Sequence, residues 1–517
     1  MLDPYLPMFV EYLNGKYLKV TIITLRCLSN LLKFQLPSLK QHSKQIATKL
    51  FNLLRTYSGA STSSSSDDIR GDNFELLMVC YKVISSLIRD CDNFNLDEEQ
   101  LQVLMHYAER NLYDNYKQAS AFNLIKAVLH RKLECEELNE VLAKVMKLSI
   151  QADSPNVRLQ SRQTILQYVL DYSLNEKRLM KILEFYIVQL DYEYENGRES
   201  SLEMIATMFN TFPLSKLNEN ATVFFLPLAI QLHNDESPKC KKLSWHALKS
   251  LLEKISIEKR DSLFEIVTFL FNDQEKPLHK RIAALLTKVF IEVETDQFER
   301  RLDSLLPIVL KEIDTTNFNE KLETNTNSLI NEKFYDQYLI NMLSLLTKLF
   351  SECKSLFKNN KYTTLINQLF DQIKIYLTHE HSWVRLNSSQ LFGLLFANNT
   401  VDELINNKKS YFYHSTESVH LKIRDLIDSF CVQLKSPILD NALAEQIVKN
   451  LAYMSKIVNR NEYNHDENST DSLINHDINI EWLIKKVIKE AKYELVNKPN
   501  ETIKVTIFIL FMIFKII

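Results

Sequence analysis

The chain has 517 residues, more than a single hydrophobic core accommodates, so we expect several domains or one elongated array. Only 5 glycines and 11 prolines are present, which favours helices and argues against β-turn-rich folds and glycine-rich phosphate loops. The formal net charge of -3 excludes nucleic-acid binding driven by overall composition, although local basic patches remain compatible with it.

The 7 cysteines are scattered and show no C-x-x-C spacing, so the sequence indicates neither a zinc site nor a disulfide framework. This cysteine usage fits a reducing compartment. The first residues lack the basic and apolar regions of a secretory signal, so no export is expected.

Residues 1–55 carry apolar side chains at helical spacing and are predicted to form the first helical repeats. Residues 56–70 contain a Ser-rich run without apolar periodicity, which predicts a flexible insertion. Residues 71–313 are again periodic and are predicted to form an array of HEAT-like repeats.

The stretch Asp153–Leu170 shows the unit of this array. Ser154 or Asp153 is expected to cap a helix, and Pro155 lacks a donor where none is needed. One small, apolar face of the helix is formed by Val157, Ser161, Ile165, Leu166, Val169 and Leu170. Such a face requires a partner helix.

Comparable starts recur about every 40 residues, a period typical of two-helix HEAT units. The expected cap positions are Asp114, Ser154, Asn196, Ser237 and the Lys276–Pro277 pair. Because neither helix of a pair buries its apolar face alone, neighbouring pairs must stack. The sequence therefore predicts an all-α fold, an α-solenoid of HEAT-like two-helix repeats.

Residues 314–333 are predicted to be a polar insertion, and residues 334–458 to resume the repeats. Residues 459–480 are predicted to be a flexible loop, followed by a terminal helical segment over 481–504. The apolar tail, 505–517, has too few residues to cross a hydrocarbon core of roughly 30 Å. A truncated core helix, a weak tail anchor and an artefact of the chain end are alternatives, and we favour truncation.

The sequence contains no glycine-rich phosphate loop, nucleophile elbow or H-E-x-x-H motif, so we expect no enzyme, no cofactor and no metal. His379 and His381 flank Glu380 and could form a small metal cluster, but an exposed turn between helices is the favoured interpretation.

Basic residues recur near the start of successive second helices and could form a ridge for RNA phosphates or a partner. The ridge candidates are Lys239, Lys241, Lys242, Lys280 and Arg281. A solvated face paired with nearby carboxylates is the alternative. Tyr186, Tyr192 and Tyr194 could stack on bases, but core packing is the favoured role.

Several segments of the chain are recognisable as well as periodic. They are Arg70–Leu77, Ala119–Leu133, Gln189–Ala206, Lys239–Lys242, Phe298–Leu302 and Trp383–Phe396. The segment at residues 192–200, Tyr-Glu-x-Glu-x-Gly-Arg-Glu-Ser, is the most specific part. Together these segments resemble the DRIM (down-regulated in metastasis) family, over most of the chain up to about Lys504.

This resemblance implies a nucleolar, non-catalytic HEAT-repeat scaffold of the small-subunit processome, which supports early processing of the precursor to 18S rRNA. The implied partners are processome proteins, pre-rRNA and U3 snoRNA, with no small-molecule substrate and no membrane. Family members are much longer, and this sequence resembles a portion towards their C-terminus. Their long N-terminal arrays are missing here, and residues 505–517 stand where a Lys/Arg-rich tail is expected.

Two other classes of protein use comparable helical arrays. A transport receptor or a phosphatase-type adaptor is one alternative, and a membrane-attached coat component, which rests only on residues 505–517, is another. Periodicity does not separate these classes, and the family resemblance favours the processome scaffold.

Overall fold

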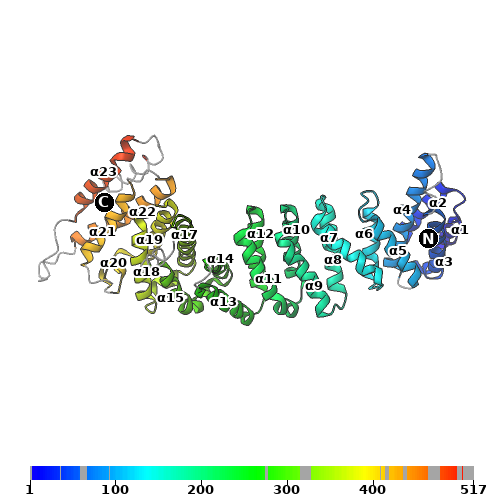
Figure 1. The fold of residues 1–517 in the computed structure, drawn as a ribbon, viewed down its shortest axis with the longest axis horizontal. Helices are drawn as coiled ribbons and strands as arrows, with labels where there is room; N and C mark the ends of the chain where they lie inside the picture. The colour runs from blue at the N-terminus through cyan, green and yellow to red at the C-terminus, as the bar shows by residue number, and fades with distance from the viewer. Residues whose placement is uncertain are drawn as a thin grey trace. The chain divides into compact units, whose positions relative to one another are not determined.

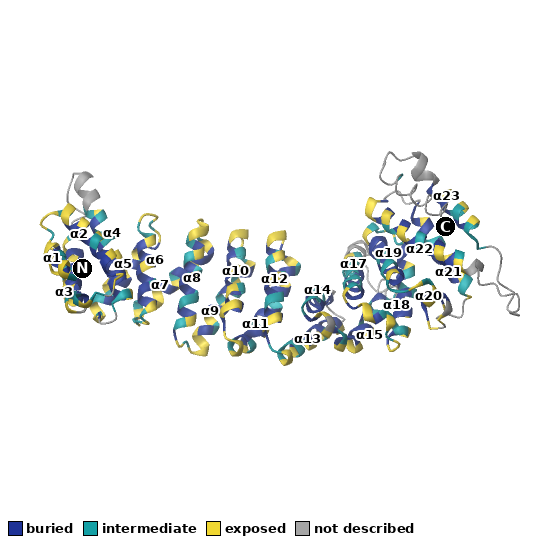
Figure 2. Cartoon of the chain, turned by 180° about the vertical axis from the view of Figure 1, so that it is seen from behind, coloured by how far each residue is buried: buried dark blue, intermediate teal, exposed yellow. Residues whose placement is uncertain are grey.

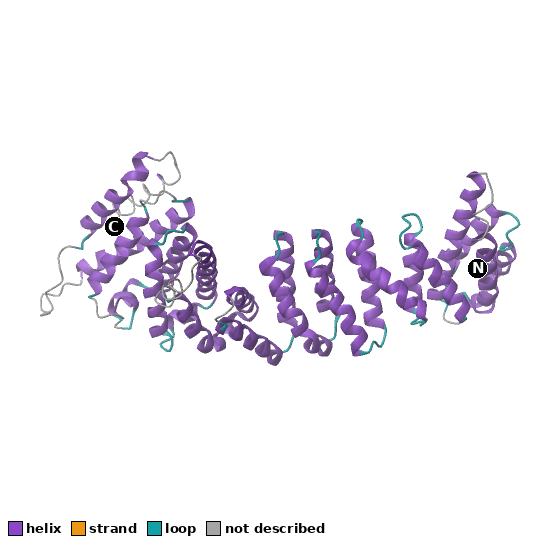
Figure 3. Cartoon of the chain, viewed as in Figure 1, coloured by secondary structure: helices purple, strands orange, loops and turns teal. Residues whose placement is uncertain are grey.

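The computed structural model of the chain describes residues 3–34, 36–58, 67–91, 94–273, 277–314, 328–407, 409–413, 418–434, 439–463, 478–497 and 504. Helices and turns account for these residues, and no strand occurs among them (Figure 3). The expected all-α class is confirmed.

The chain divides into two compact units, which are described separately. The N-terminal unit comprises Met1–Leu217 and Asp235–Ala247. Its helices are η1 (Asp3–Tyr5), α1 (Leu6–Tyr12), α2 (Leu18–Leu31), α3 (Pro37–Ser58), α4 (Asp67–Asp90), α5 (Glu98–Asn111), α6 (Gln118–His130), α7 (Glu136–Gln151), α8 (Pro155–Asp171), α9 (Glu176–Val188), η3 (Gln189–Asp191) and α10 (Glu195–Thr211). Residues of α11 (Leu214–Asn234) and α12 (Pro238–Lys254) belong to both units.

The C-terminal unit comprises Asn218–Asn234 and Leu248–Ile517. Its further helices are α13 (Ile257–Asn272), α14 (Pro277–Glu294), η4 (Thr295–Arg301), α15 (Leu302–Ile313), α17 (Ser328–Glu352), η5 (Lys354–Lys358), α18 (Thr363–Ile375), η6 (Tyr376–Thr378), α19 (Ser382–Asn398), α20 (Val401–Asn406), η7 (Tyr411–Tyr413), α21 (Val419–Gln433), α22 (Asn441–Tyr463) and α23 (Ile480–Asn497).

Within each unit the helices pack as a stack of antiparallel pairs (Figure 1). In the N-terminal unit the second helices of the pairs, α2, α4, α6, α8 and α10, pack one against the next. In the C-terminal unit α14, α17, α19 and α22 form the equivalent row, and α13, α15 and α18 lie in the other layer. This arrangement confirms the predicted solenoid of HEAT-like two-helix repeats.

The core lies between neighbouring helices, and Figure 2 colours the buried residues dark blue. In α8, Ile165 and Val169 are fully buried as expected, together with Tyr168. Leu166 is only half-buried and Leu170 is 42 % exposed, so their predicted place on the buried face is wrong. The polar side chain of Thr164 is fully buried on this helix instead, and its hydroxyl donates to the backbone oxygen of Gln160 at 2.8 Å.

Five described helices extend into stretches that were expected to be irregular. α3 continues to Ser58, and α23 begins at Ile480, the last residue of the expected loop 459–480. α4 begins at Asp67, inside the expected insertion 56–70, and α17 begins at Ser328, inside the expected insertion 314–333. α22 continues to Tyr463, past the expected start of a loop at residue 459. A polar helix end has little apolar periodicity, so its length was underestimated. Residues 59–66, 315–327, 464–477 and 505–517 lie outside the described residues.

The expected helix starts are correct to different degrees. Pro277 is the first residue of α14, and Ser237 Oγ accepts a hydrogen bond from Cys240 N at 3.2 Å, as a capping serine does. Ser154 precedes α8, but its side chain makes no capping bond. Asn196 lies inside α10, and Asp114 forms a turn with Tyr116 N ahead of α6.

Candidate partner-binding surfaces

The five predicted ridge residues differ in exposure. Lys239 and Lys242 are exposed, and Lys241 is half-buried. Lys280 and Arg281 are only 7 % and 8 % exposed, and they belong to the other unit of the chain. The prediction that these two residues line an exposed ridge is therefore wrong.

Ion pairs explain the placement of two of these lysines. Lys280 Nζ lies 2.7 and 2.8 Å from the two carboxylate oxygens of Glu312 on α15, so its charge is used inside the unit. Lys239 Nζ lies 2.7 Å from Glu199 Oε2 on α10, and this hydrogen bond raises the pKa of Lys239. The charge of Glu195 acts in the same direction. The surface around Lys239 is thus of mixed charge.

An arginine at the fourth position of a second helix holds the preceding turn in three repeats. In each case Nη1 donates to the backbone carbonyls five and six positions earlier, at distances between 2.7 and 3.0 Å. These turn-clamping arginines are Arg158 in α8, Arg198 in α10 and Arg385 in α19. They satisfy carbonyls that the turn leaves without helical partners.

Lys241 and Lys280 occupy the same fourth position in α12 and α14. The recurrence of basic residues that suggested a phosphate-binding ridge therefore coincides with a structural position of the repeat. Periodicity in the sequence marks this position whether its side chain points to solvent or to the preceding turn. Exposure separates the two roles, and exposure is not visible in a single sequence.

The most family-specific segment forms one such turn. Arg198 is bidentate to buried Asp235, with Nε–Oδ2 at 2.9 Å and Nη2–Oδ1 at 3.1 Å, and these hydrogen bonds raise the pKa of Arg198. A Cβ at Gly197 would lie 2.3 Å from Cδ1 of Tyr192, so only glycine allows this ring to lie against α10. The segment therefore fixes the packing of one repeat onto the next.

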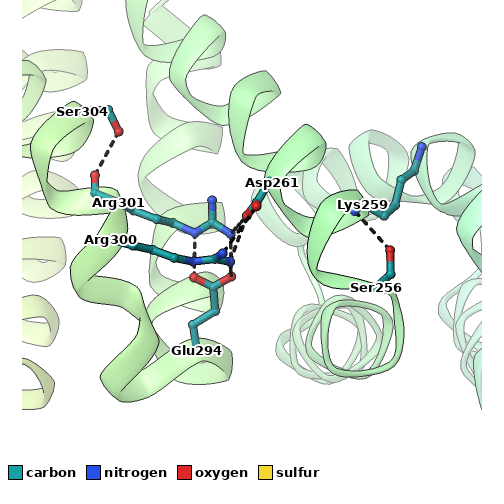
Figure 4. A network of polar contacts seen from close by, with 7 residues as sticks. All are labelled: Ser256, Lys259, Asp261, Glu294, Arg300, Arg301 and Ser304. Carbon is teal, nitrogen blue, oxygen red and sulfur yellow. Dashed lines mark hydrogen bonds and ion pairs between the residues drawn. The ribbon is translucent and has the colours of Figure 1, made fainter.

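A second resembling segment, Phe298–Leu302, contributes to the polar network shown in Figure 4. Arg301 donates to both oxygens of Glu294 at 2.6 Å and to Asp261 Oδ1 at 2.8 Å, and Arg300 reaches Asp261 Oδ1 at 2.9 Å. The guanidinium of Arg301 also lies 4.4 Å from the ring centre of Phe264. Since Glu294 and Arg301 are buried, this network joins α13, α14 and η4 rather than displaying charge to a ligand.

The three candidate stacking tyrosines do not form one surface. Tyr186 is fully buried, its hydroxyl lies 3.0 Å from Ser149 Oγ, and burial raises its pKa. Tyr192 is half-buried beside Gly197, and Tyr194 is 62 % exposed. Core or turn packing thus accounts for the first two, and only Tyr194 offers a ring to a partner.

The turn at His379–His381 leads into α19. His381 Nδ1 accepts a hydrogen bond from Trp383 N at 3.2 Å, and the carbonyls of His379 and Glu380 accept from Arg385. This arrangement matches the favoured inter-helix turn, with His381 as a helix cap. Among the described residues, no group of three His, Cys, Asp or Glu side chains could hold a metal ion.

Cysteines lie in both units. Cys80 and Cys431 are fully buried, and burial raises the pKa of each to about 12. Burial also raises the pKa of Cys240, to about 11. Their thiols are therefore protonated and poorly reactive at neutral pH.

The α17–α19–α22 groove is a surface that the sequence did not indicate. It is a cavity of about 530 Å³ within the C-terminal unit, between three second helices that lie side by side (Figure 1). Small and amide side chains line much of it. They include Thr347 and Ser351 from α17, Gln390 and Gly393 from α19, and Gln446 and Asn450 from α22. Gly393, one of only 5 glycines and inside a helix, was the available signal.

Residues 279–516 match a family model described as "Small subunit processome component 20 homolog, C-terminal". The predicted resemblance is confirmed as a similarity to proteins of this description over most of the chain. The chain is 22 % identical over 387 residues to "U3 small nucleolar RNA-associated protein 20" of Schizosaccharomyces pombe, a match covering 75 % of this chain and 15 % of the relative. The Saccharomyces cerevisiae protein of the same description is 25 % identical over 465 residues, covering 88 % and 17 %. The matched part of the chain thus spans about a sixth of the length of these relatives.

Solved structures of other helical-repeat proteins are also similar to the chain. A structure of importin β has a TM-score of 0.38 at 12 % identity, covering 99 % of this chain and 57 % of that one. A structure of Kap95p with RanGDP has a TM-score of 0.41 at 11 % identity, covering 99 % and 65 %. These likenesses concern the fold alone. Among the described helices, none is both long and apolar enough to span a membrane.

Proposed function

We propose that this chain acts in ribosome biogenesis, as a non-catalytic scaffold component of the small-subunit processome that supports processing of pre-rRNA towards 18S rRNA. The observation that carries the proposal is the similarity of most of the chain to two proteins described as U3 small nucleolar RNA-associated protein 20. The proposed location is the nucleolus, and the proposed partners are processome proteins, pre-rRNA and U3 snoRNA.

The chemistry of the described surfaces agrees with a scaffold. Most recurring charged residues, such as Arg198, Lys280 and Arg301, hold turns and neighbouring helices together. A stack of repeats offers a long surface for partners without requiring catalytic groups. The exposed lysines Lys239 and Lys242, with half-buried Lys241, remain our candidates for contact with RNA or a partner.

Depletion of the protein tests the proposal. We expect precursors of 18S rRNA to accumulate at the expense of mature 18S rRNA, and a tagged chain to co-sediment with large pre-ribosomal particles. Re-expression of the chain should restore 18S rRNA if this part carries the essential contacts. Free sedimentation of the tagged chain, or unchanged 18S processing after depletion, would contradict the proposal. Specific capture of a small GTPase or a phosphatase catalytic subunit would support the alternative classes instead.

A further inference from the structure

The α17–α19–α22 groove has the features of a peptide-binding site. We propose that it binds an extended, acidic segment of a partner protein, whose main chain pairs with the carboxamide of Gln446 and whose carboxylate lies near Lys449. A volume of about 530 Å³ lies within the range of ligand-binding sites and accommodates a segment of a few residues.

A relay of hydrogen bonds positions Gln446. Asn450 is 1 % exposed, and its Nδ2 donates to the backbone oxygen of Ser389 at 2.8 Å. Its Oδ1 accepts from Nε2 of Gln446 at 3.0 Å. Because Ser389 lies on α19 and both amides lie on α22, the relay is anchored across two helices. Gln446 is consequently held in one orientation at the edge of the groove.

The outer side of the Gln446 carboxamide faces no described donor. No residue that the structure describes donates a hydrogen bond to Oε1, and the amide nitrogen has a second N–H besides the one used in the relay. A carboxamide presents one acceptor and one donor in the same plane, which is the complement of a peptide unit. A bound main chain would satisfy both groups at once.

Gly393 makes this arrangement possible. A Cβ at this position would lie 2.3 Å from Nε2 of Gln446 and 3.2 Å from Oδ1 of Asn450. A glycine inside a helix is destabilising relative to alanine, so its presence in α19 requires a local reason. The close approach of the Gln446 and Asn450 amides provides that reason.

The aromatic rings of Phe396 and Tyr453 form part of the wall of the groove. Phe396 and Tyr453 stack with their ring centres 4.7 Å apart and an interplanar angle of 7°. The hydroxyl of Tyr453 donates to the backbone oxygen of Asn399 at 2.5 Å, which fixes its ring. A fixed wall reduces the entropy lost when a ligand binds.

The charges around the groove select the kind of partner. Among the described residues that line it, none is a carboxylate, and the one charged side chain is the exposed Lys449. A peptide that carries Asp or Glu therefore fits better than a basic one. A nucleic acid fits poorly, because a single lysine neutralises few phosphates.

This inference rests on the proposed function, because it names the class of partner that the scaffold binds. It is tested on the purified full chain. Short random peptides displayed on phage are selected on the full chain, and labelled synthetic copies of the enriched peptides are titrated by fluorescence anisotropy. We expect enrichment of acidic sequences. Peptide binding is measured separately from 18S processing, so a negative result in one measurement does not change the interpretation of the other.

Three variants locate the bound peptide. Gly393→Ala places a methyl group against Gln446, Gln446→Ala removes the carboxamide without a clash, and Lys449→Glu reverses the charge. We expect each to weaken binding by ~10-fold, equivalent to ~1.4 kcal/mol. Lys456→Glu changes an exposed lysine on the same helix outside the groove and should bind as the wild type does.

Thermal unfolding of each variant distinguishes a loss of peptide binding from a loss of the fold. If Gly393→Ala does not fold, the binding affinity of Gln446→Ala tests the proposal. The proposal is overturned if no acidic peptide is enriched, or if the enriched peptides bind Gln446→Ala and Lys449→Glu as tightly as the wild type. Competition by a single-stranded RNA oligonucleotide that depends on the same residues would identify a nucleic acid as the occupant instead.

Discussion

At the turn between α9 and α10, the side chain of Arg198 links three features of the repeat. It satisfies two turn carbonyls and neutralises Asp235, whose side chain is fully buried. The sequence places Arg158 at the same position of α8, where it is another turn-clamping arginine. It did not reveal the role of Arg198, because the arginine and its carboxylate are 37 positions apart in the chain.

Replacement of Arg198 by alanine leaves Asp235 buried without its cation. We expect Arg198→Ala to lower the free energy of unfolding by about 3 kcal/mol, in the range found when one partner of a buried ion pair is removed. Urea unfolding followed by circular dichroism measures the change. Arg178→Ala, at an exposed position on α9, is the matched control and should change stability by less than about 0.5 kcal/mol. Equal effects of the two substitutions would refute the clamping role.

Lys288 on α14 makes the stability of the folded chain depend on pH. Its Nζ donates to Ser344 Oγ at 2.8 Å, and burial lowers its pKa from the ordinary 10.5 to about 8. Between these pH values the unfolded chain binds a proton that the folded chain does not, so this lysine makes stability rise with pH through that window. Below pH 8 both states are protonated, and the cost of burying the ammonium is constant.

The variant Lys288→Met removes this titration. Its stability relative to the wild type should be greatest below pH 8 and should decline as the pH rises towards 10, as measured by melting temperature across that range. A difference between the two proteins that does not change with pH would show that Lys288 keeps its ordinary pKa.

At the scale of helices, the sequence predicted the class and pairing of the elements better than their ends. Apolar periodicity depends on burial and therefore identifies the middle of a helix such as α8. The polar starts of α4 and α17 lack that signal. Groove formation was also beyond prediction, because it depends on Gln446 and Asn450 of α22 meeting Gly393 of α19 in the folded state.

Two serines that precede a proline test the capping argument. Ser237 Oγ accepts from Cys240 N and also lies 2.5 Å from Glu195 Oε1, whereas Ser154 makes no capping bond. Ser237→Ala should therefore cost about 1 kcal/mol of stability, and Ser154→Ala close to none. The melting temperatures of the two variants, measured under the same conditions, compare the two losses of stability. A larger loss from Ser154→Ala would mean that its hydroxyl caps α8 in solution.

At the scale of the whole molecule, helical periodicity predicts a fold that many functions share. The sequence resemblance, in contrast, points to one group of proteins. The matched relatives are about five times as long as this chain, so the described units correspond to one part of such a protein. The surface charge of that part is mixed, as the pairing of Lys239 with Glu199 shows. Any contact with RNA is therefore expected to be local.

The exposed Lys242 tests that local contact. If it meets a phosphate, Lys242→Glu should weaken binding of the chain to a single-stranded RNA oligonucleotide and reduce the salt slope by about one. Filter binding over a range of salt concentrations measures both quantities, with Lys177→Glu at an exposed position on α9 as the control. Equal binding by both variants would remove Lys242 from the candidates.

The buried thiols described above provide a built-in report on local opening. Cys80 belongs to the N-terminal unit and Cys431 to the C-terminal unit, and both are shielded in the folded state. An alkylating reagent therefore modifies either residue only while the surrounding helices separate. Mass spectrometry of the two peptides over time should give a different rate for each unit if the units open independently. Binding of a peptide in the α17–α19–α22 groove should then slow modification of Cys431 and leave that of Cys80 unchanged.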